Sequence, residues 1–141
     1  MVLGPIGGPI PRNSSLMDAR AMLGVAWLRL MTAREAYSMT DIASTSRDAV
    51  GAVTCAAEAL AMHLPDESPS AVIDDMDAAE ALCVKYVEGP IVELFAQVRA
   101  IEVARPIDSA LTNVQRDAID RGLQATSDLL ALIETAVVKR D

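Results

Sequence analysis

Hydrophobic positions dominate residues 49–64, which read AVGAVTCAAEALAMHL. Glu58 is the only formally charged side chain in this stretch, and Thr54 and His63 are its other strongly polar groups. In a soluble protein, a helix that is apolar around most of its circumference is a buried helix. The frequent alanines let neighbouring backbones approach closely, so we expect this segment to be the central helix of a bundle with two or three other helices packed around it.

A seven-residue pattern precedes the central segment. It combines a large side chain in each heptad with an alanine three residues further on: Leu16, Leu23, Leu30 and Tyr37, with Ala19, Ala26 and Ala33. This pattern is typical of close antiparallel helix packing. It predicts a helix from Ser14 or Ser15 to about Met39, with its Leu/Ala row against the central helix. A second row is predicted to widen the buried face: Met17, Gly24, Leu28 and Met31.

The rest of the chain is divided at turn residues. Thr40 or Asp41 is expected to cap the start of the central helix, and the proline-rich stretch 65–69 to follow its end near Leu64. At Gly89-Pro90 two interpretations stay open, a new helix beginning at Pro90 or one long helix kinked there. Three further helices are expected: 71–88 capped by Ser70, 90–104, and a last one that Asp108 or Ser109 caps and that runs to about Lys139.

The first thirteen residues have a different composition. They read MVLGPIGGPIPRN, and their prolines exclude a regular helix because each fixes φ and removes a backbone donor. We expect residues 1–13 to form an extended arm and residues 14–141 to form one domain. The predicted fold is all-α, an antiparallel helical bundle of four to five helices with an extended Pro/Gly-rich N-terminal arm.

Composition supports this fold class and excludes several functions. Hydrophobic residues make up 52% of the chain but aromatic residues only 3%, which favours helix packing over a β-sandwich. The net charge of −8 argues against nucleic acid as a partner. No run of eighteen apolar residues predicts a membrane span, and the start of the chain lacks the basic region of a secretory signal. Two cysteines are too few for a disulfide framework, so we expect a cytoplasmic protein.

Acidic residues are concentrated in the middle of the chain. No lysine or arginine occurs between Asp48 and Val84, although eight acidic residues stand in that range. Such a face either keeps an apolar protein in solution or docks a basic partner. If the region is an interaction surface, it combines these acids with apolar residues of the arm: Ile6, Ile10, Asp66, Glu67, Asp74, Asp75 and Asp77.

The usual catalytic and metal-binding patterns are missing. His63 is the single histidine and has no glutamate three residues before it, so a ferritin-like di-iron site is not expected. No calcium-binding loop or phosphate-binding loop is present. Cys55 stands eight residues before His63, which on a helix separates them by about 12 Å and prevents a direct dyad. We therefore predict neither a metal nor a cofactor.

Three functional hypotheses follow. The leading one is a non-enzymatic protein that acts through protein–protein interaction, either by self-association, most simply as a homodimer, or by regulatory or adaptor binding to another protein. The reason is that the helices carry more apolar surface than four of them can hide. The second is a bundle that binds an apolar small molecule, lined by Trp27, Met31, Met62 and Phe95. The third is a small metal-free enzyme in which Glu58, Arg99 and Glu102 converge in a cleft.

Overall fold

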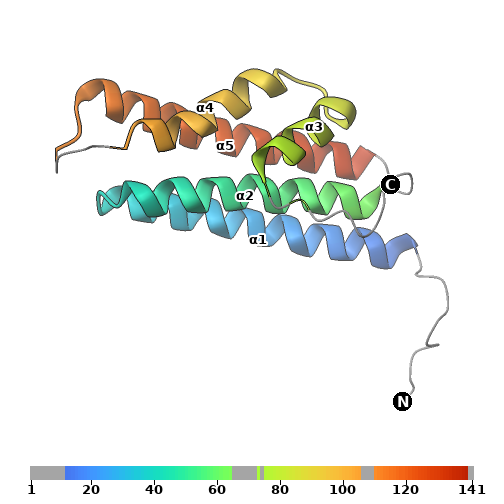
Figure 1. The fold of residues 1–141 in the computed structure, drawn as a ribbon. Coiled ribbons are helices and arrows are strands. Elements are labelled where there is room, and N and C mark those ends of the chain that lie inside the picture. Colours follow the sequence, from blue (N-terminus) through green and yellow to red (C-terminus); the bar gives the residue numbers. More distant parts are fainter. Residues whose placement is uncertain (1–11, 65–72, 74, 106–109, 140–141) are drawn as a thin grey trace, which may run out of the picture.

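The computed structural model describes residues 12–64, 73, 75–105 and 110–139, and within these ranges it contains helices and no strand. Figure 1 shows the five helices with their connections. They are α1 (Arg12–Ser38), α2 (Ile42–His63), α3 (Met76–Tyr86), α4 (Ile91–Val103) and α5 (Asn113–Lys139). The predicted all-α bundle is confirmed. The predicted arm, except for Arg12 and Asn13 at the start of α1, lies outside the described residues.

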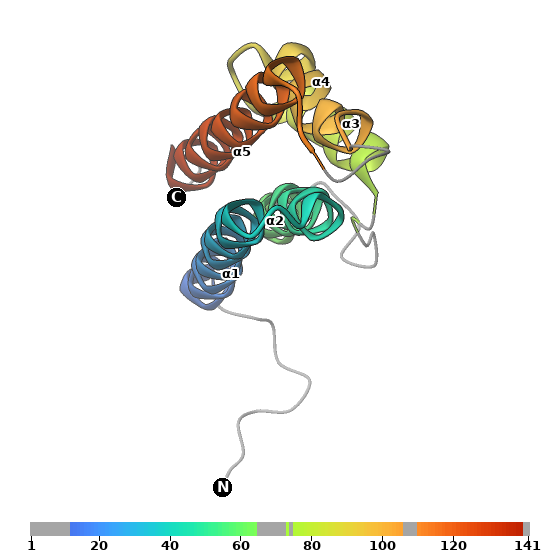
Figure 2. The same ribbon diagram turned by 90° about the vertical axis from the view of Figure 1, so that its left-hand side faces the viewer.

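The helices form two layers. Figure 2 shows α1 beside α2 in one layer, and α5 with the two short helices α3 and α4 in the other. In Figure 1, α1 and α2 run in opposite directions, as do α4 and α5. Helix α2 packs against all four other helices. The prediction that the alanine-rich segment is the central helix is therefore confirmed, with more neighbours than expected.

Small side chains make this central position possible. The alanines of α2 that face its neighbours are fully buried, among them Ala49, Ala52, Ala56 and Ala59. Alanine loses no side-chain entropy on burial and keeps the helix axes close together. Larger side chains from the other helices fill the remaining space, including Phe95 of α4. The core therefore combines a thin central helix with bulky partners.

The turn between α1 and α2 is tight. Thr40 has a positive φ of 57°, and the amide of Asp41 donates to the carbonyl of Ala36 at 2.9 Å. These are features of a helix C-terminus closed by a left-handed residue. The carboxylate of Asp41 then caps α2 by accepting from the amide of Ser44 at 3.1 Å. Of the two predicted caps, Asp41 is confirmed, while Thr40 closes the preceding helix.

Two separate helices, and not one kinked helix, precede and follow Gly89-Pro90. Gly89 has a φ of +144°, a value that residues with a Cβ rarely adopt, and Pro90 directly precedes α4. The chain is therefore fully interrupted between α3 and α4. The prediction for α3 was wrong at its start, because the helix begins at Met76 and its cap is Asp75, five residues beyond the predicted cap Ser70.

Helix α5 begins with a reciprocal cap. The hydroxyl of Thr112 accepts from the amide of Gln115 at 3.1 Å, and the side-chain oxygen of Gln115 accepts from the amide of Thr112 at 2.8 Å. This is the capping-box arrangement. The predicted caps, Asp108 and Ser109, lie outside the described residues. The first helix also differs from its prediction, since α1 already includes Ser14 and Ser15.

Candidate functional site

Helix α1 lies at the edge of the molecule, where it packs mainly against α2 and to a lesser extent against α5. Its predicted Leu/Ala row is buried: Ala19, Leu23, Ala26, Leu30 and Ala33 are at most 3% exposed. The second predicted row is not buried. Leu28 is 61% exposed and Met31 is 63% exposed, and Gly24 is also on the surface. The prediction was wrong for these three residues, because no helix of the described ranges covers the side of α1 that faces away from α2 and α5, while the side chain of Met17, the fourth residue of the row, lies outside the described part.

The exposed row continues into charged residues at both ends. Arg20, Gly24, Leu28, Met31 and Glu35 are all exposed and follow one another at steps of four, four, three and four residues. This spacing places them in one line along a helix. We call these five residues the α1 outer face. It has an apolar centre, a positive charge at one end and a negative charge at the other.

The middle of the α1 outer face is sterically open at Gly24. A Cβ added to Gly24 would meet no atom within 4 Å outside its own helix backbone and chain neighbours. Next to it, a cavity of about 320 Å³ lies between α1 and α5. Its lining comprises Arg20, Leu23, Gly24, Trp27, Glu134 and Val138. Since Arg20 and Gly24 belong to both features, the cavity opens beside the α1 outer face.

The four residues predicted to line an apolar ligand cavity occupy different environments. Trp27 is half-buried and lines the cavity between α1 and α5. Met31 is 63% exposed and Met62 is 41% exposed, each on the surface of its helix. Phe95 is fully buried, with the guanidinium carbon of Arg99 at 5.8 Å from its ring centre. Of the four, Trp27 alone contributes to the α1–α5 cavity.

The seven residues of the predicted interaction surface divide into two groups. Ile6, Ile10, Asp66, Glu67 and Asp74 lie outside the described residues. The other two have structural partners. Asp75 accepts from the amide of Ala78 at 2.8 Å and so caps α3.

The remaining acid, Asp77, forms an ion pair across the α3–α4 contact. Its carboxylate accepts from Arg99 at 2.8 Å, and Arg99 also donates to Glu80 at 2.5 Å. These bonds raise the pKa of Arg99, with the hydrogen bond to Glu80 as the largest cause. Sequence reasoning missed this bridge, although the three-residue spacing of Asp77 and Glu80 on one helix face was visible.

The residues proposed for an enzyme come together only in part. Arg99 and Glu102 line a groove between α2 and α4, whereas Glu58 is not among the residues that line it. The thiols are poor nucleophiles: burial raises the pKa of Cys83 to about 12 and also raises the pKa of Cys55. No group of three or more His, Cys, Asp or Glu side chains able to hold a metal ion occurs within the described ranges.

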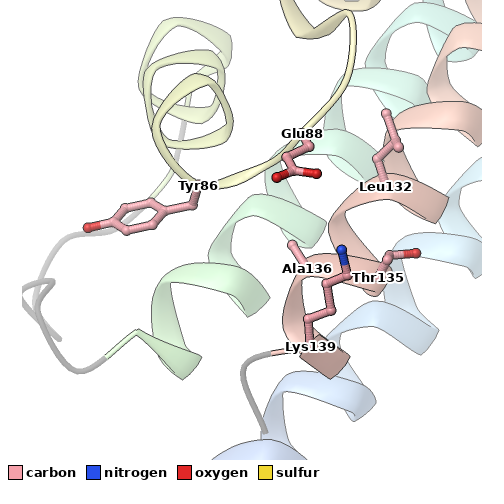
Figure 3. A pocket seen from close by; sticks show the side chains of 6 residues that line it. All are labelled: Tyr86, Glu88, Leu132, Thr135, Ala136 and Lys139. Atoms are coloured by element: carbon pink, nitrogen blue, oxygen red, sulfur yellow. The ribbon is translucent and has the colours of Figure 1, made fainter.

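Another cavity, of about 340 Å³, lies near the C-terminal end of α5. Figure 3 shows its lining, in which Tyr86 and Glu88 come from the end of α3 and the segment after it, and the other residues from α5. Leu132 and Ala136 give it an apolar wall, and Glu88 and Lys139 carry opposite charges. Both charged residues are exposed, so this cavity is a shallow surface feature.

Two further findings concern membrane spans and similarity to known proteins. None of the helices in the described ranges combines the length and apolar character needed to cross a membrane. Comparisons with protein-family models, with curated proteins and with solved structures gave no match.

Proposed function

We propose that this protein is a non-enzymatic interaction protein that forms a homodimer through the α1 outer face. The observation that carries the proposal is the exposure of Leu28 and Met31 at the centre of a continuous line on an edge helix. Exposed apolar residues scattered singly need no explanation, but a line bounded by charges is typical of an association surface. The occupant we infer is a second copy of this chain.

Charge complementarity supports a second copy in antiparallel orientation. In a twofold dimer each side uses the same surface, so the face must complement itself. We place the twofold axis at Leu28. Arg20 is eight residues before Leu28 and Glu35 is seven residues after it, so Arg20 of one copy lies beside Glu35 of the other. The symmetry generates this attractive pair twice. A parallel pairing would instead place like charges together, which is unfavourable.

Shape complementarity supports the same orientation. Gly24 is four residues before Leu28 and Met31 is three residues after it, so the antiparallel pairing brings Met31 of one copy to Gly24 of the other. The cavity of about 320 Å³ between α1 and α5 opens there, and Leu23 and Trp27 give it an apolar lining. A flexible methionine fits irregular apolar spaces well. Each copy would thus insert one side chain beside Trp27 of the other.

The test is the mass in solution, measured by light scattering coupled to size exclusion and by sedimentation from micromolar to near-millimolar concentration. We expect a dimer for the wild type. Leu28→Glu should raise the dimer dissociation constant at least about 30-fold, because the change occurs in both copies at the centre of the interface. Val114→Glu is the matched control, since Val114 is 80% exposed on α5.

The control decides how the result is interpreted. Circular dichroism should report unchanged helix content in both variants, because both positions are exposed. A monomeric wild type at every concentration would disprove the proposal. Equal loss of the dimer in the Leu28 and Val114 variants would also contradict it, because it would place the contact away from the α1 outer face.

A further inference from the structure

A groove between the first half of α2 and the end of α4 is larger than the α1–α5 cavity and the cavity near the end of α5. Its volume is about 630 Å³. Its lining comes from both helices and from one residue two positions beyond the end of α4: Ala43, Ser46, Arg47, Val50, Arg99, Glu102, Val103 and Arg105. Three arginines and one glutamate give this lining a formal charge of +2, in a protein whose net charge is −8. The groove shares no residue with α1.

Ser46 contributes a hydroxyl group to the lining of this groove. Ser46 is only 4% exposed, and the structure gives its hydroxyl no hydrogen bond to any described residue. Its neighbour Thr45 differs, because that hydroxyl donates to the carbonyl of Asp41 at 2.8 Å. The Ser46 oxygen is not among the fully enclosed side-chain atoms that lack a partner, so it keeps contact with the groove that the residue lines. The hydroxyl of Ser46 is therefore available to a ligand that enters the groove.

The arginines at the rim are held loosely by acids of their own. Arg47 lies 3.9 Å from Asp48 and its side chain is 74% exposed, while Arg105 lies 3.5 Å from Glu102 and is 56% exposed. Exposed pairs of this kind contribute little and exchange readily. Arg99 differs, because Asp77 and Glu80 fix its position. Arg47 also donates to the hydroxyl of Ser44 at 3.1 Å. An anion in the groove would therefore have to exchange with Asp48 at Arg47 and with Glu102 at Arg105.

We propose that this groove binds a small carboxylate that carries an apolar body. A carboxylate is the planar anion that guanidinium groups recognise with paired hydrogen bonds, and the hydroxyl of Ser46 supplies one further donor. Val50 and Val103 provide the apolar surface, and Val103 is 85% exposed without a ligand. This binding function goes beyond dimer formation and does not depend on it.

The first experiment measures binding of octanoate by calorimetry and by methyl NMR, with acetate and octanol as comparison probes. Octanoate has both features that the groove recognises, whereas acetate lacks the apolar body and octanol lacks the charge. We expect octanoate to bind more tightly than either, with the largest shifts at the methyl groups of Val50 and Val103. Absence of octanoate binding at millimolar concentration, or octanol binding of equal strength, would overturn the proposal.

The second experiment assigns the binding to these residues. Ser46→Ala and Arg105→Gln should each weaken octanoate binding about tenfold, because each removes a hydrogen bond to a charged group. Arg121→Gln is the matched control, since Arg121 forms an exposed pair with Asp117 on α5. Unchanged affinity in both groove variants would refute the site, as would an equal loss in the control. Arg105 is exposed, so its variant keeps the test valid if Ser46→Ala disturbs folding.

Discussion

Gly122 of α5 lies directly against Ile101 of α4, with no room for a β-carbon between the two helices. A Cβ added to Gly122 would also lie 2.7 Å from the carbonyl oxygen of Gln97. The hydroxyl of Thr126, one turn further on, donates to the carbonyl of Gly122 at 2.8 Å. The missing side chain of Gly122 therefore allows α5 to approach α4 closely.

The first prediction concerns this contact. Gly122→Ala should lower the free energy of unfolding by about 1–3 kcal/mol, because overpacking outweighs the helix propensity of alanine. Gly24→Ala is the control for the dissociated chain, since an added Cβ at Gly24 has open space within one copy. That variant should gain about 0.5–1 kcal/mol from propensity alone. Urea unfolding at low micromolar concentration measures both, and an unchanged or higher stability of the Gly122 variant would contradict the prediction.

The sequence predicted the fold because packing follows periodicity. The Leu/Ala row of α1 repeats every seven residues, and a helix places such residues on one side. The alanine-rich segment identified α2 as the central helix by the same reasoning. Periodicity did not predict the exposure of Leu28, because an apolar face has the same sequence pattern whether or not a neighbour covers it. The surface proposed for assembly was therefore recognisable only after the helices were placed.

Contacts between residues far apart in the chain could not be predicted from the sequence pattern either. Arg99 bonds to Glu80, nineteen residues earlier, through the way α4 packs on α3. The start of α3 was misplaced because Ser70 and Asp75 are both good capping residues, and residue type alone does not show which of them begins the helix. Thr112 and Gln115 did carry a local signal, the capping-box spacing, which the sequence interpretation overlooked.

The second prediction concerns the turn between α1 and α2. Thr40 holds a φ of 57°, where a β-branched residue is strained. Thr40→Gly should raise the free energy of unfolding by about 0.5–1 kcal/mol, since glycine adopts this conformation without strain but loses more entropy on folding. Thr40→Ala keeps the positive φ and should give no comparable gain. Thermal and urea unfolding measure the difference, and equal effects of the two substitutions would exclude strain as the cause.

The third prediction follows from the Cys83 thiol. Burial is the largest cause of its raised pKa of about 12, and the charge of Glu80 adds to it, while the ordinary value is 9.0. Because the pKa of Cys83 is higher in the folded than in the unfolded state, the protonated thiol favours the folded state. This contribution to the free energy of unfolding is complete below about pH 9 and is lost as the pH rises toward 12. Above pH 9 this thiol alone should lower stability by at most about 1.4 kcal/mol per pH unit.

Cys83→Ala isolates this effect. The variant should be less stable at neutral pH because it leaves a small cavity, but its stability should fall less steeply above pH 9 than that of the wild type. The pKa of Tyr37 is also raised, chiefly by burial, so some dependence on alkaline pH should persist in the variant. Urea unfolding under reducing conditions at pH 8, 9 and 10 gives the slopes. Parallel slopes for the two proteins would show that the thiol does not contribute.

The fourth prediction separates the two acids that hold Arg99. The Glu80 side chain is 21% exposed, whereas the Asp77 side chain is 95% exposed. Solvent screening weakens an exposed ion pair, so Glu80→Gln should cost more stability than Asp77→Asn, with the latter within about 0.5 kcal/mol of the wild type. Urea unfolding at low and high salt compares them. A larger loss for the Asp77 variant would reverse the assigned order of the two contacts.

The last prediction tests the orientation of the proposed dimer. In the antiparallel arrangement Arg20 lies beside Glu35 of the other copy, so either charge reversal alone, Arg20→Glu or Glu35→Arg, creates two repulsive pairs. Each should weaken the dimer about three- to tenfold at low salt, and less at high salt. The variant with both reversals should recover the wild-type affinity, and a mixture of the two single variants should form heterodimers in preference to either homodimer. Sedimentation measures all four cases.

A parallel dimer would give a different result. There, Arg20 faces Arg20 of the other copy and Glu35 faces Glu35, so each single reversal replaces one pair of like charges by another and leaves the affinity unchanged. Unchanged affinity in the single variants would therefore disprove the antiparallel arrangement.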